Sequence, residues 1–263
     1  MRFEKKVVVI TGASSGLGRQ LSIDFAREGA SVILFSRNEE KLLETFNMLD
    51  SQSSSLVIGD VTDIEKCYQL AEYTFNKYGR IDYLVMNAGL SMWAEFDKID
   101  NIGAFKNLFE VNFWGVVNSF KAFSKHLHSS KGMAIFISSA QGKFGVPYHT
   151  IYSASKHAVQ GFINSLRFEF KDIHLLSVLP HWVSGTELRE NALNSAGEKI
   201  HDQKKSHTSE SVTVQECSKR ILSAAFKKKH ELIMPFKLKM LMWLYSLNQR
   251  LAEKIIRSKV HSQ

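Results

Sequence analysis

The fold of this chain is decided near its N-terminus, by the stretch Val7-Val8-Val9-Ile10-Thr11-Gly12-Ala13-Ser14-Ser15-Gly16-Leu17-Gly18. Its first four residues are β-branched, which is typical of a strand buried on both faces. The next segment, Arg19–Glu28, has helical periodicity and ends at Gly29. A glycine-rich turn between a strand and a helix predicts a dinucleotide-binding site, because the glycines permit close backbone approach and the helix N-terminus attracts a pyrophosphate. The alternative is a plain glycine turn.

Strands and helices alternate through the rest of the chain. This alternation predicts an α/β fold with a parallel sheet and right-handed crossovers. We expect further strands at residues 31–35, 56–58, 81–86, 133–137, 175–179 and 231–234, and helices at 38–49, 63–78, 105–127, 148–170 and 213–226. Residues 51–55 are expected to form a polar loop, and the polar segment 187–212 a lid or a surface loop.

Polar side chains follow five of the expected strands. In a parallel sheet the ligand crevice lies at the C-terminal ends of the strands. We therefore expect these side chains to border one site: Thr11, Arg37, Asp60, Asn87 and Ser139.

A serine, a tyrosine and a lysine form the candidate catalytic group. Tyr152 and Lys156 lie four residues apart on an expected helix, so they share one face and can point into one pocket. An ammonium beside a phenol favours the phenolate and lowers the phenol pKa, which would let Tyr152 exchange a proton near neutral pH. Ser139 would reach the same pocket from the end of the strand 133–137. Taken alone, a tyrosine and a lysine at this spacing also occur by chance on many helices.

The end of the second strand bears on the choice of dinucleotide. An NAD site usually places an Asp or Glu there to bind the ribose 2′-hydroxyl. Here the tip is Ser36-Arg37, and an arginine suits a 2′-phosphate through charge-assisted hydrogen bonds. We therefore expect NADP(H) in preference to NAD(H). The alternative is an ordinary surface arginine, because Glu39 and Glu40 follow closely.

Composition is that of a single-domain enzyme from a reducing compartment. At 263 residues, one α/β domain is expected. The two cysteines, Cys67 and Cys217, lie far apart without metal-ligand spacing, so we expect neither a disulfide framework nor a metal site. The apolar run at residues 7–10 is too short for a signal peptide, and no stretch is long enough to span a bilayer, which favours a cytoplasmic protein.

From about Lys5 to Met234 the chain resembles the short-chain dehydrogenases/reductases. The resemblance is carried by Thr11-Gly12-x-x-x-Gly16-x-Gly18, Asp60-Val61, Asn87-Ala88-Gly89, Asn112, Ser139 and Tyr152-x-x-x-Lys156. It implies a Rossmann fold, a three-layer, doubly wound sheet of seven parallel strands, with one NADP(H)-binding catalytic domain over residues 1–234. It also implies that hydride passes between nicotinamide and a carbonyl carbon, which interconverts a carbonyl and a secondary alcohol. The Ser36-Arg37 tip resembles that of NADP-preferring members.

The resemblance implies roles for individual residues. Tyr152 would transfer the proton, Lys156 would bind the ribose hydroxyls and lower the Tyr152 pKa, and Ser139 would hydrogen-bond the substrate carbonyl. Asn112 would hold a water that links Lys156 to solvent, although its residue type and position equally fit a satisfied core amide. The residues expected at the cofactor are Thr11, Gly12, Ser14, Ser15, Gly16, Leu17, Gly18, Ser36, Arg37, Asp60, Val61, Asn87, Ala88, Gly89, Tyr152, Lys156, Pro180, Val183 and Thr186.

Two positions depart from the family pattern. His181 follows Pro180 where the family has glycine, and the threonine that usually binds the carboxamide falls on Gly185, with Thr186 next to it. Thr186 would take over that contact through a shift of one residue.

Aromatic residues flank the catalytic motifs and are expected to wall an apolar substrate site. They are Trp93, Phe144, Tyr148 and Trp182, with Val146 beside them. The alternative for Phe144 and Val146 is core packing. An apolar pocket favours a lipid-like, steroid-like or aromatic carbonyl compound as substrate.

The C-terminal segment 235–263 extends beyond the resemblance. Residues 227–259 contain nine basic and two acidic residues, a net charge of +7 within a chain of +8. We expect an amphipathic helix over Pro235–Val260, with Leu238, Leu241, Met242, Tyr245, Ala252, Ile255 and Ile256 on its apolar side. It would cover the substrate mouth or a partner subunit, or lie on an anionic membrane through residues 236–259. Nucleic-acid binding is not expected, because no recognised motif accompanies the charge.

Two further expectations concern assembly and catalysis. The resemblance implies a homodimer or homotetramer built on the helices of Asn112 and Tyr152. The alternative functions are a non-catalytic NADP(H)-binding sensor and a membrane-surface binding module that uses the basic tail. A sensor would be free to lose Tyr152, and the chain keeps it.

Overall fold

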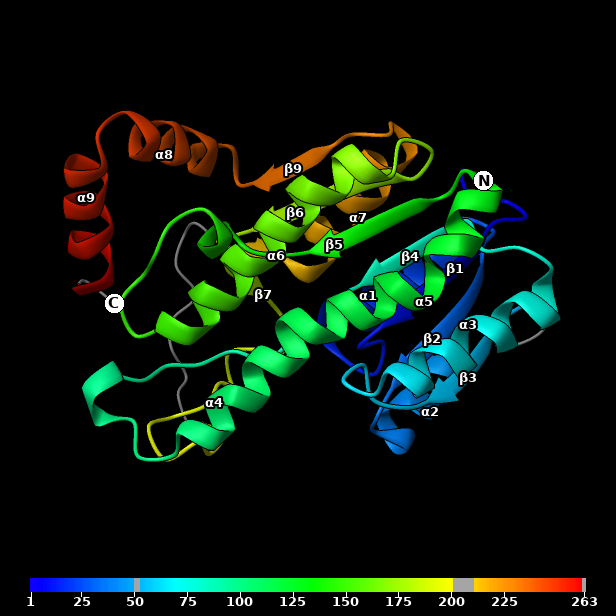
Figure 1. Cartoon of the computed structure of the whole chain (residues 1–263), viewed down its shortest axis with the longest axis horizontal. Helices are drawn as coiled ribbons and strands as arrows, with labels where there is room; N and C mark the ends of the chain where they lie inside the picture. Colours follow the sequence, from blue (N-terminus) through cyan, green and yellow to red (C-terminus); the bar gives the residue numbers. More distant parts are fainter. Residues whose placement is uncertain (50–52, 201–210, 262–263) are drawn as a thin grey trace.

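The central sheet has seven parallel strands in the order β3-β2-β1-β4-β5-β6-β9 (Figure 1). The computed structural model describes residues 1–49, 53–200 and 211–261. The strands are β1 (Val7–Thr11), β2 (Ser31–Ser36), β3 (Ser55–Ile58), β4 (Tyr83–Met86), β5 (Met133–Ile137), β6 (His174–Pro180) and β9 (Glu231–Met234). The strand order reverses between β1 and β4, and in open α/β sheets ligands bind at this switch point. The expected doubly wound, seven-stranded Rossmann sheet is confirmed.

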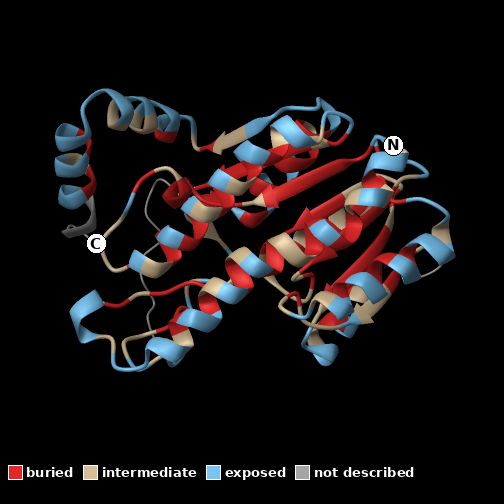
Figure 2. Ribbon diagram, in the orientation of Figure 1, coloured by how far each residue is buried: buried red, intermediate tan, exposed pale blue. Residues whose placement is uncertain are grey.

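Helices cover both faces of the sheet, so the molecule has three layers. The helices are α1 (Gly16–Arg27), α2 (Glu39–Asn47), α3 (Ile64–Tyr78), α4 (Ile102–Phe109), α5 (Gly115–Ser130), α6 (Thr150–Glu169) and α7 (Val214–Phe226). α1 packs beside α7 over one core, whereas α3 and α5 cover the other. Figure 2 shows the strands buried between these layers. The apolar runs in the sequence therefore form two cores, one on each face.

The expected helix 105–127 is interrupted in the structure. α4 ends at Phe109, a π-helical turn spans Glu110–Trp114, and α5 begins at Gly115. Asn112 lies in this turn and is fully buried. π-helical turns inside helices are rare and are frequent at functional sites, because they redirect one side chain.

The chain that directly follows β6 forms a rim beside the main sheet and not another of its strands. Two short parallel strands, β7 (Val183–Ser184) and β8 (Val212–Thr213), pair with each other. Of the expected lid or loop 187–212, residues 201–210 lie outside the described residues, as do residues 51 and 52 of the expected loop 51–55. Short 3₁₀ turns occur at Phe96–Lys98 and Ala140–Gly142.

The expected single C-terminal helix is wrong in one respect, because the segment forms two helices. α8 (Phe236–Leu247) and α9 (Gln249–His261) are separated at Asn248, whose side chain accepts a hydrogen bond from the Leu251 N–H (3.1 Å). The expected apolar side is confirmed at Leu238 and Ile256, which are buried in one cluster with Ala140 and Phe144. The break lets both short helices turn this side inward (Figure 2). Within the described residues, no helix is long and apolar enough to cross a membrane. The division of the chain after residue 234 stays a prediction.

Candidate active site

A cavity of about 710 Å³ opens at the C-terminal edge of the sheet. Residues from distant parts of the chain meet there because parallel strands end at one edge. Most of the expected site residues line it: Gly12, Ser14, Ser15, Gly16, Leu17, Ser36, Arg37, Asp60, Val61, Asn87, Ala88, Gly89, Ser139, Tyr152, Lys156, Pro180, Trp182, Val183 and Thr186. Thr11, Gly18 and Asn112 are not among the lining residues and lie behind it.

The glycine-rich turn joins β1 to the start of α1 with no room for side chains. A Cβ on Gly18 would lie 2.1 Å from the Gly12 carbonyl oxygen, and Gly12 itself has φ +66°. The backbone N–H of Asn87 donates to Thr11 Oγ1 (3.0 Å), which ties the turn to the end of β4. The N-cap residue of α1, Ser15, makes no side-chain cap hydrogen bond, so the first N–H groups of the helix remain available to an anion. These features fit the phosphates of a dinucleotide.

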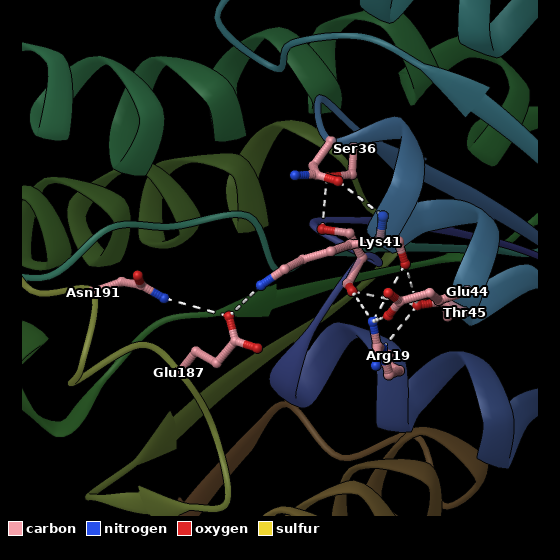
Figure 3. A network of polar contacts seen from close by, with 9 residues as sticks. Arg19, Ser36, Lys41, Glu44, Thr45, Glu187 and Asn191 are labelled. Atoms are coloured by element: carbon pink, nitrogen blue, oxygen red, sulfur yellow. Dashed lines mark hydrogen bonds and ion pairs between the residues drawn. The ribbon is translucent and has the colours of Figure 1, made fainter. Parts of the chain in front are cut away.

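Charged side chains border the other end of this groove, at the tip of β2. Arg37 pairs with Asp60 at 3.3 Å across the ends of β2 and β3, and just over half of its side chain is exposed. Figure 3 shows Lys41 and Asn191 both directed at the Glu187 carboxylate. Lys41 Nζ lies 2.8 Å from it, so an ion pair connects α2 with the rim after β7. Two cations, Arg37 and Lys41, therefore face this end of the cavity.

The candidate catalytic group converges as the spacing indicates. Tyr152 and Lys156 are both buried on one face of α6, and Lys156 Nζ lies 5.7 Å from the centre of the Tyr152 ring. Lys156 donates to the Ile137 carbonyl oxygen (3.1 Å) at the end of β5. Ser139 Oγ accepts a hydrogen bond from the Gln141 N–H (3.2 Å), and the serine side chain also hydrogen-bonds with Tyr152.

Burial, not the neighbouring charge, dominates the acid–base properties of this group. Burial raises the pKa of Tyr152 to about 12, and a hydrogen bond with Ser139 lowers it only in part. Burial also lowers the pKa of Lys156 to about 8. The expected lowering of the Tyr152 pKa by Lys156 is therefore wrong for the protein alone. Loss of hydration penalises both charged forms, and the ammonium is directed at a carbonyl oxygen.

Asn112 occupies a fully satisfied position beneath the site. Its Oδ1 accepts from the Leu90 N–H (2.8 Å), and its Nδ2 donates to the Leu90 carbonyl oxygen (3.0 Å) and to Ser155 Oγ (3.1 Å). These bonds match the core-amide interpretation of this residue. They hold the chain after β4 against α6, and so fix Gly89 beside Lys156.

The expected aromatic wall is divided between three places. Trp182 lines the main cavity, whereas Trp93 stacks on Tyr148 (5.3 Å between ring centres) and borders a small adjoining space with Trp182. Phe144 and Val146 do not line the cavity, because they pack beneath α8 and α9. The sequence pattern could not distinguish the aromatic residues that line the cavity from those that do not. All of them lie near the catalytic motifs, but on loops whose path depends on what packs over them.

The structure locates the two residues that depart from the family pattern. Thr186 lines the cavity and faces Gly16, while its hydroxyl donates to the Val183 carbonyl oxygen (3.0 Å). The backbone N–H of His181 donates to the Met234 carbonyl oxygen (2.8 Å), which ties the chain after β6 to the end of β9.

Several cavity residues were missed by the sequence reasoning: Lys41, Gln141, Glu187, Arg189 and Asn191. Lys41 had a usable signal, because it lies four residues after Arg37 at the start of a helix. The other rim residues had none, since their segment is polar and irregular and resembles a solvated loop.

The doubly wound sheet, the glycine-rich turn and the Ser139–Tyr152–Lys156 group define a dinucleotide-binding oxidoreductase of the Rossmann class. The family model for short chain dehydrogenases matches residues 6–197. This chain belongs to the short-chain dehydrogenase/reductase family.

Similar proteins include several dehydrogenases. A dehydrogenase/reductase SDR family protein 7-like from Dictyostelium discoideum is 35% identical over 88% of this chain and 74% of its own length. An 11-beta-hydroxysteroid dehydrogenase-like 4A from Arabidopsis thaliana is 31% identical over 92% and 80%. An 11-beta-hydroxysteroid dehydrogenase A from Sesamum indicum is 35% identical over 75% of this chain but only 58% of its own.

Two solved structures share the fold. A short chain dehydrogenase/reductase from Burkholderia phymatum, in complex with NAD, superposes with a TM-score of 0.83, at 20% identity over 95% of this chain and 96% of that one. An alcohol dehydrogenase from Thermococcus sibiricus, complexed with 5-hydroxy-NADP, superposes with a TM-score of 0.74, at 24% identity over 87% and 95%. At these identities the likeness concerns the fold.

Proposed function

We propose that this oxidoreductase interconverts a carbonyl and a secondary alcohol with NADP(H). The observation that carries the proposal is the convergence of Ser139, Tyr152 and Lys156 on the same cavity that the glycine-rich turn borders. Proton-transfer groups and a phosphate-binding turn that share one space suit a reaction in which a dinucleotide and a second molecule meet.

The chain's own residues supply the proton and hold the carbonyl. When bound, a nicotinamide dinucleotide supplies or accepts the hydride. Ser139 would donate a hydrogen bond to the carbonyl oxygen through its hydroxyl proton, while its oxygen accepts from the Gln141 N–H. Tyr152 donates its proton to that oxygen in reduction and takes it back in oxidation. Lys156 would donate to the ribose hydroxyls of the bound dinucleotide.

Replacing the tyrosine tests the reaction. Tyr152→Phe keeps the ring and removes the proton, so the rate of NADPH oxidation with a panel of ketones should fall by roughly 10²–10⁴-fold. The affinity for NADP+, measured by calorimetry, should change little. Undiminished turnover in Tyr152→Phe would refute the mechanism. Tight dinucleotide binding without turnover of any carbonyl compound by the wild-type protein would favour the sensor instead.

Arg37 and Lys41 support a preference for NADP(H) over NAD(H). Both are cations at the tip of β2, and each is paired with a carboxylate that a 2′-phosphate can replace. Removing Arg37 should weaken NADPH binding about 10-fold or more and leave NADH binding unchanged. Arg220→Ala, on the exposed face of α7, is the matched control. A wild-type preference for NADH would overturn the assignment.

An apolar substrate is supported by Trp182 and by the relatives named as 11-beta-hydroxysteroid dehydrogenases. A steroid-like, lipid-like or aromatic carbonyl compound is therefore the substrate class that we propose. Turnover restricted to small sugars would contradict it.

We also propose that α8 lies on an anionic membrane surface. Large apolar side chains are exposed along α8 and into α9, at Phe236, Met240, Trp243, Leu247 and Leu251. The same segment, 227–259, has a net charge of +7, which suits anionic headgroups. Trp243→Ser with Met240→Ser should release the protein from phosphatidylserine vesicles in a flotation assay. Equal partitioning of the variant and the wild type would exclude this surface.

We propose a homodimer or homotetramer that forms through α5 and α6. The proposal is supported by two exposed aromatic side chains, Trp114 just before α5 and Phe168 near the end of α6. Light scattering of the purified protein decides it, and a monomer at micromolar concentration would refute it.

A further inference from the structure

Arg189 lies in the rim after β7 and faces the substrate side of the cavity. Its guanidinium lies over the ring of Trp182, 4.7 Å from the ring centre, and 5.9 Å from the centre of the Trp93 ring. It borders both the main cavity and the small adjoining space. This cation thus lies within cation–π distance of two tryptophan rings, which favour its position.

Within the described residues, Arg189 has no anionic partner. Its Nε is buried and has no hydrogen-bond partner, and no carboxylate of these residues lies within ion-pair distance. Glu187 of this rim is already paired with Lys41, and among the described residues neither Glu190 nor Glu198 forms an ion pair with Arg189. Burial lowers the pKa of the Arg189 guanidinium, because nothing offsets its lost hydration. A partly buried cation without a partner is energetically unfavourable unless an anion binds to it.

Aromatic and apolar side chains predominate in the small space beside Arg189. The adjoining space is lined by Ser91, Met92, Trp93, His149, Trp182, Ala192 and Ile200 besides Arg189. A planar guanidinium in such a setting matches a carboxylate attached to an apolar body, through two parallel charge-assisted hydrogen bonds.

We propose that Arg189 binds a carboxylate of the substrate, so that the enzyme acts on apolar oxo acids rather than on neutral ketones. The inference rests on the proposed carbonyl chemistry and narrows its substrate class. The phosphates of the dinucleotide are the other anions that can reach the cavity. They have their own site at the glycine-rich turn and the start of α1, whereas Arg189 is held between Trp93 and Trp182.

A series of ring contacts connects Arg189 with the catalytic phenol. From Arg189 the contacts run to Trp182, then to His149 (5.5 Å between ring centres) and then to Tyr152 (6.1 Å). Because two rings separate the cation from the catalytic phenol, the carboxylate and the carbonyl belong at different ends of the substrate.

The test compares 4-oxo-4-phenylbutanoate with its methyl ester. Calorimetry on the protein loaded with NADP+ measures binding of each without turnover, and NADPH oxidation then gives KM for each. The variants are Arg189→Met, Arg189→Lys and, as a control far from the cavity, the exposed Arg27→Met. We expect the wild type to prefer the acid. Arg189→Met should weaken acid binding about 10-fold or more and leave ester and NADP+ binding unchanged, while Arg189→Lys lies between.

The outcomes separate this inference from the proposed function. Equal affinity of the wild type for acid and ester, or unchanged acid binding in Arg189→Met, overturns the carboxylate site. So does an Arg189→Met variant that loses NADP+ affinity instead, since the cation then serves the dinucleotide. Arg189-dependent binding of the acid without NADPH oxidation supports the anion site and contradicts the carbonyl reaction. Reduction of both compounds with the same KM in wild type and Arg189→Met supports the reaction and refutes the inference.

Discussion

Lys156→Met should make the protein without cofactor more stable at pH 7, although it removes a catalytic group. Lys156 is 4% exposed, and its ammonium donates to one carbonyl oxygen, that of Ile137. No carboxylate of the described residues pairs with it. The native state therefore holds a charge that has lost most of its hydration, and methionine has a similar length without that charge.

The magnitude follows from the pKa of the buried amine. A pKa of about 8 in place of 10.5 corresponds to about 3 kcal/mol of destabilisation wherever the amine is charged in both states. The lost hydrogen bond to Ile137 offsets about 1 kcal/mol of the gain. The expected net gain in the free energy of unfolding is about 2 kcal/mol at pH 7, or roughly 4–8 °C in Tm.

The pKa of the buried amine also predicts how the stability difference between the wild type and Lys156→Met changes with pH. Below pH 8 the lysine is charged in the folded and the unfolded states, so the full penalty applies. Between about pH 8 and 10.5 the unfolded chain binds more protons than the folded protein, so wild-type stability rises relative to the variant. The difference between the two proteins should therefore shrink over this range. Tyr152 is present in both proteins, so its own titration above pH 10 cancels.

Urea unfolding followed by tryptophan fluorescence, from pH 6.5 to pH 10, measures the difference. The exposed Lys121→Met on α5 is the control and should shift the midpoint little at any pH. A Lys156→Met protein that is less stable than the wild type at pH 7 would refute the reasoning. A gain that stays constant up to pH 10 would show that charge burial is not its source. NADPH-dependent activity should fall in either case.

Two other substitutions test the packing around the site. Gly18→Ala places a Cβ 2.1 Å from the Gly12 carbonyl oxygen, so dinucleotide affinity and Tm should both fall, whereas Gly161→Ala, with open space on α6, should gain about 0.5–1 kcal/mol. Equal effects of the two alanines, compared by thermal unfolding and NADP+ titration, would contradict the steric argument. Phe144→Ala removes a buried ring from beneath α8 and α9 and should cost about 3–5 kcal/mol locally. Limited proteolysis should then cleave near residue 235 first, and an unchanged digestion pattern would show that Phe144 does not hold these helices.

Local patterns in the sequence predicted the elements whose cause is local. The β-branched run at Val7–Ile10, the alternation of strands and helices and the expected parallel sheet agree with the structure, because burial on both faces requires such runs. The π-helical turn at Asn112 was not predicted. It depends on contacts of Asn112 with Leu90 and Ser155, which are distant in the chain. The break at Asn248 was also missed, although its side chain accepts from the Leu251 N–H and so caps α9 through a local contact.

The sequence by itself determined which residues reach the catalytic edge, since the end of every parallel strand brings its next side chain to the same place. Tertiary structure decided how those side chains behave. Burial comes from the whole surrounding chain. It raises the pKa of Tyr152 and lowers that of Lys156, which is opposite to the shifts expected from the pair alone. The position of an aromatic ring on a loop depends equally on its neighbours. For this reason only the structure shows Phe144 beneath the C-terminal helices and Arg189 between two tryptophans.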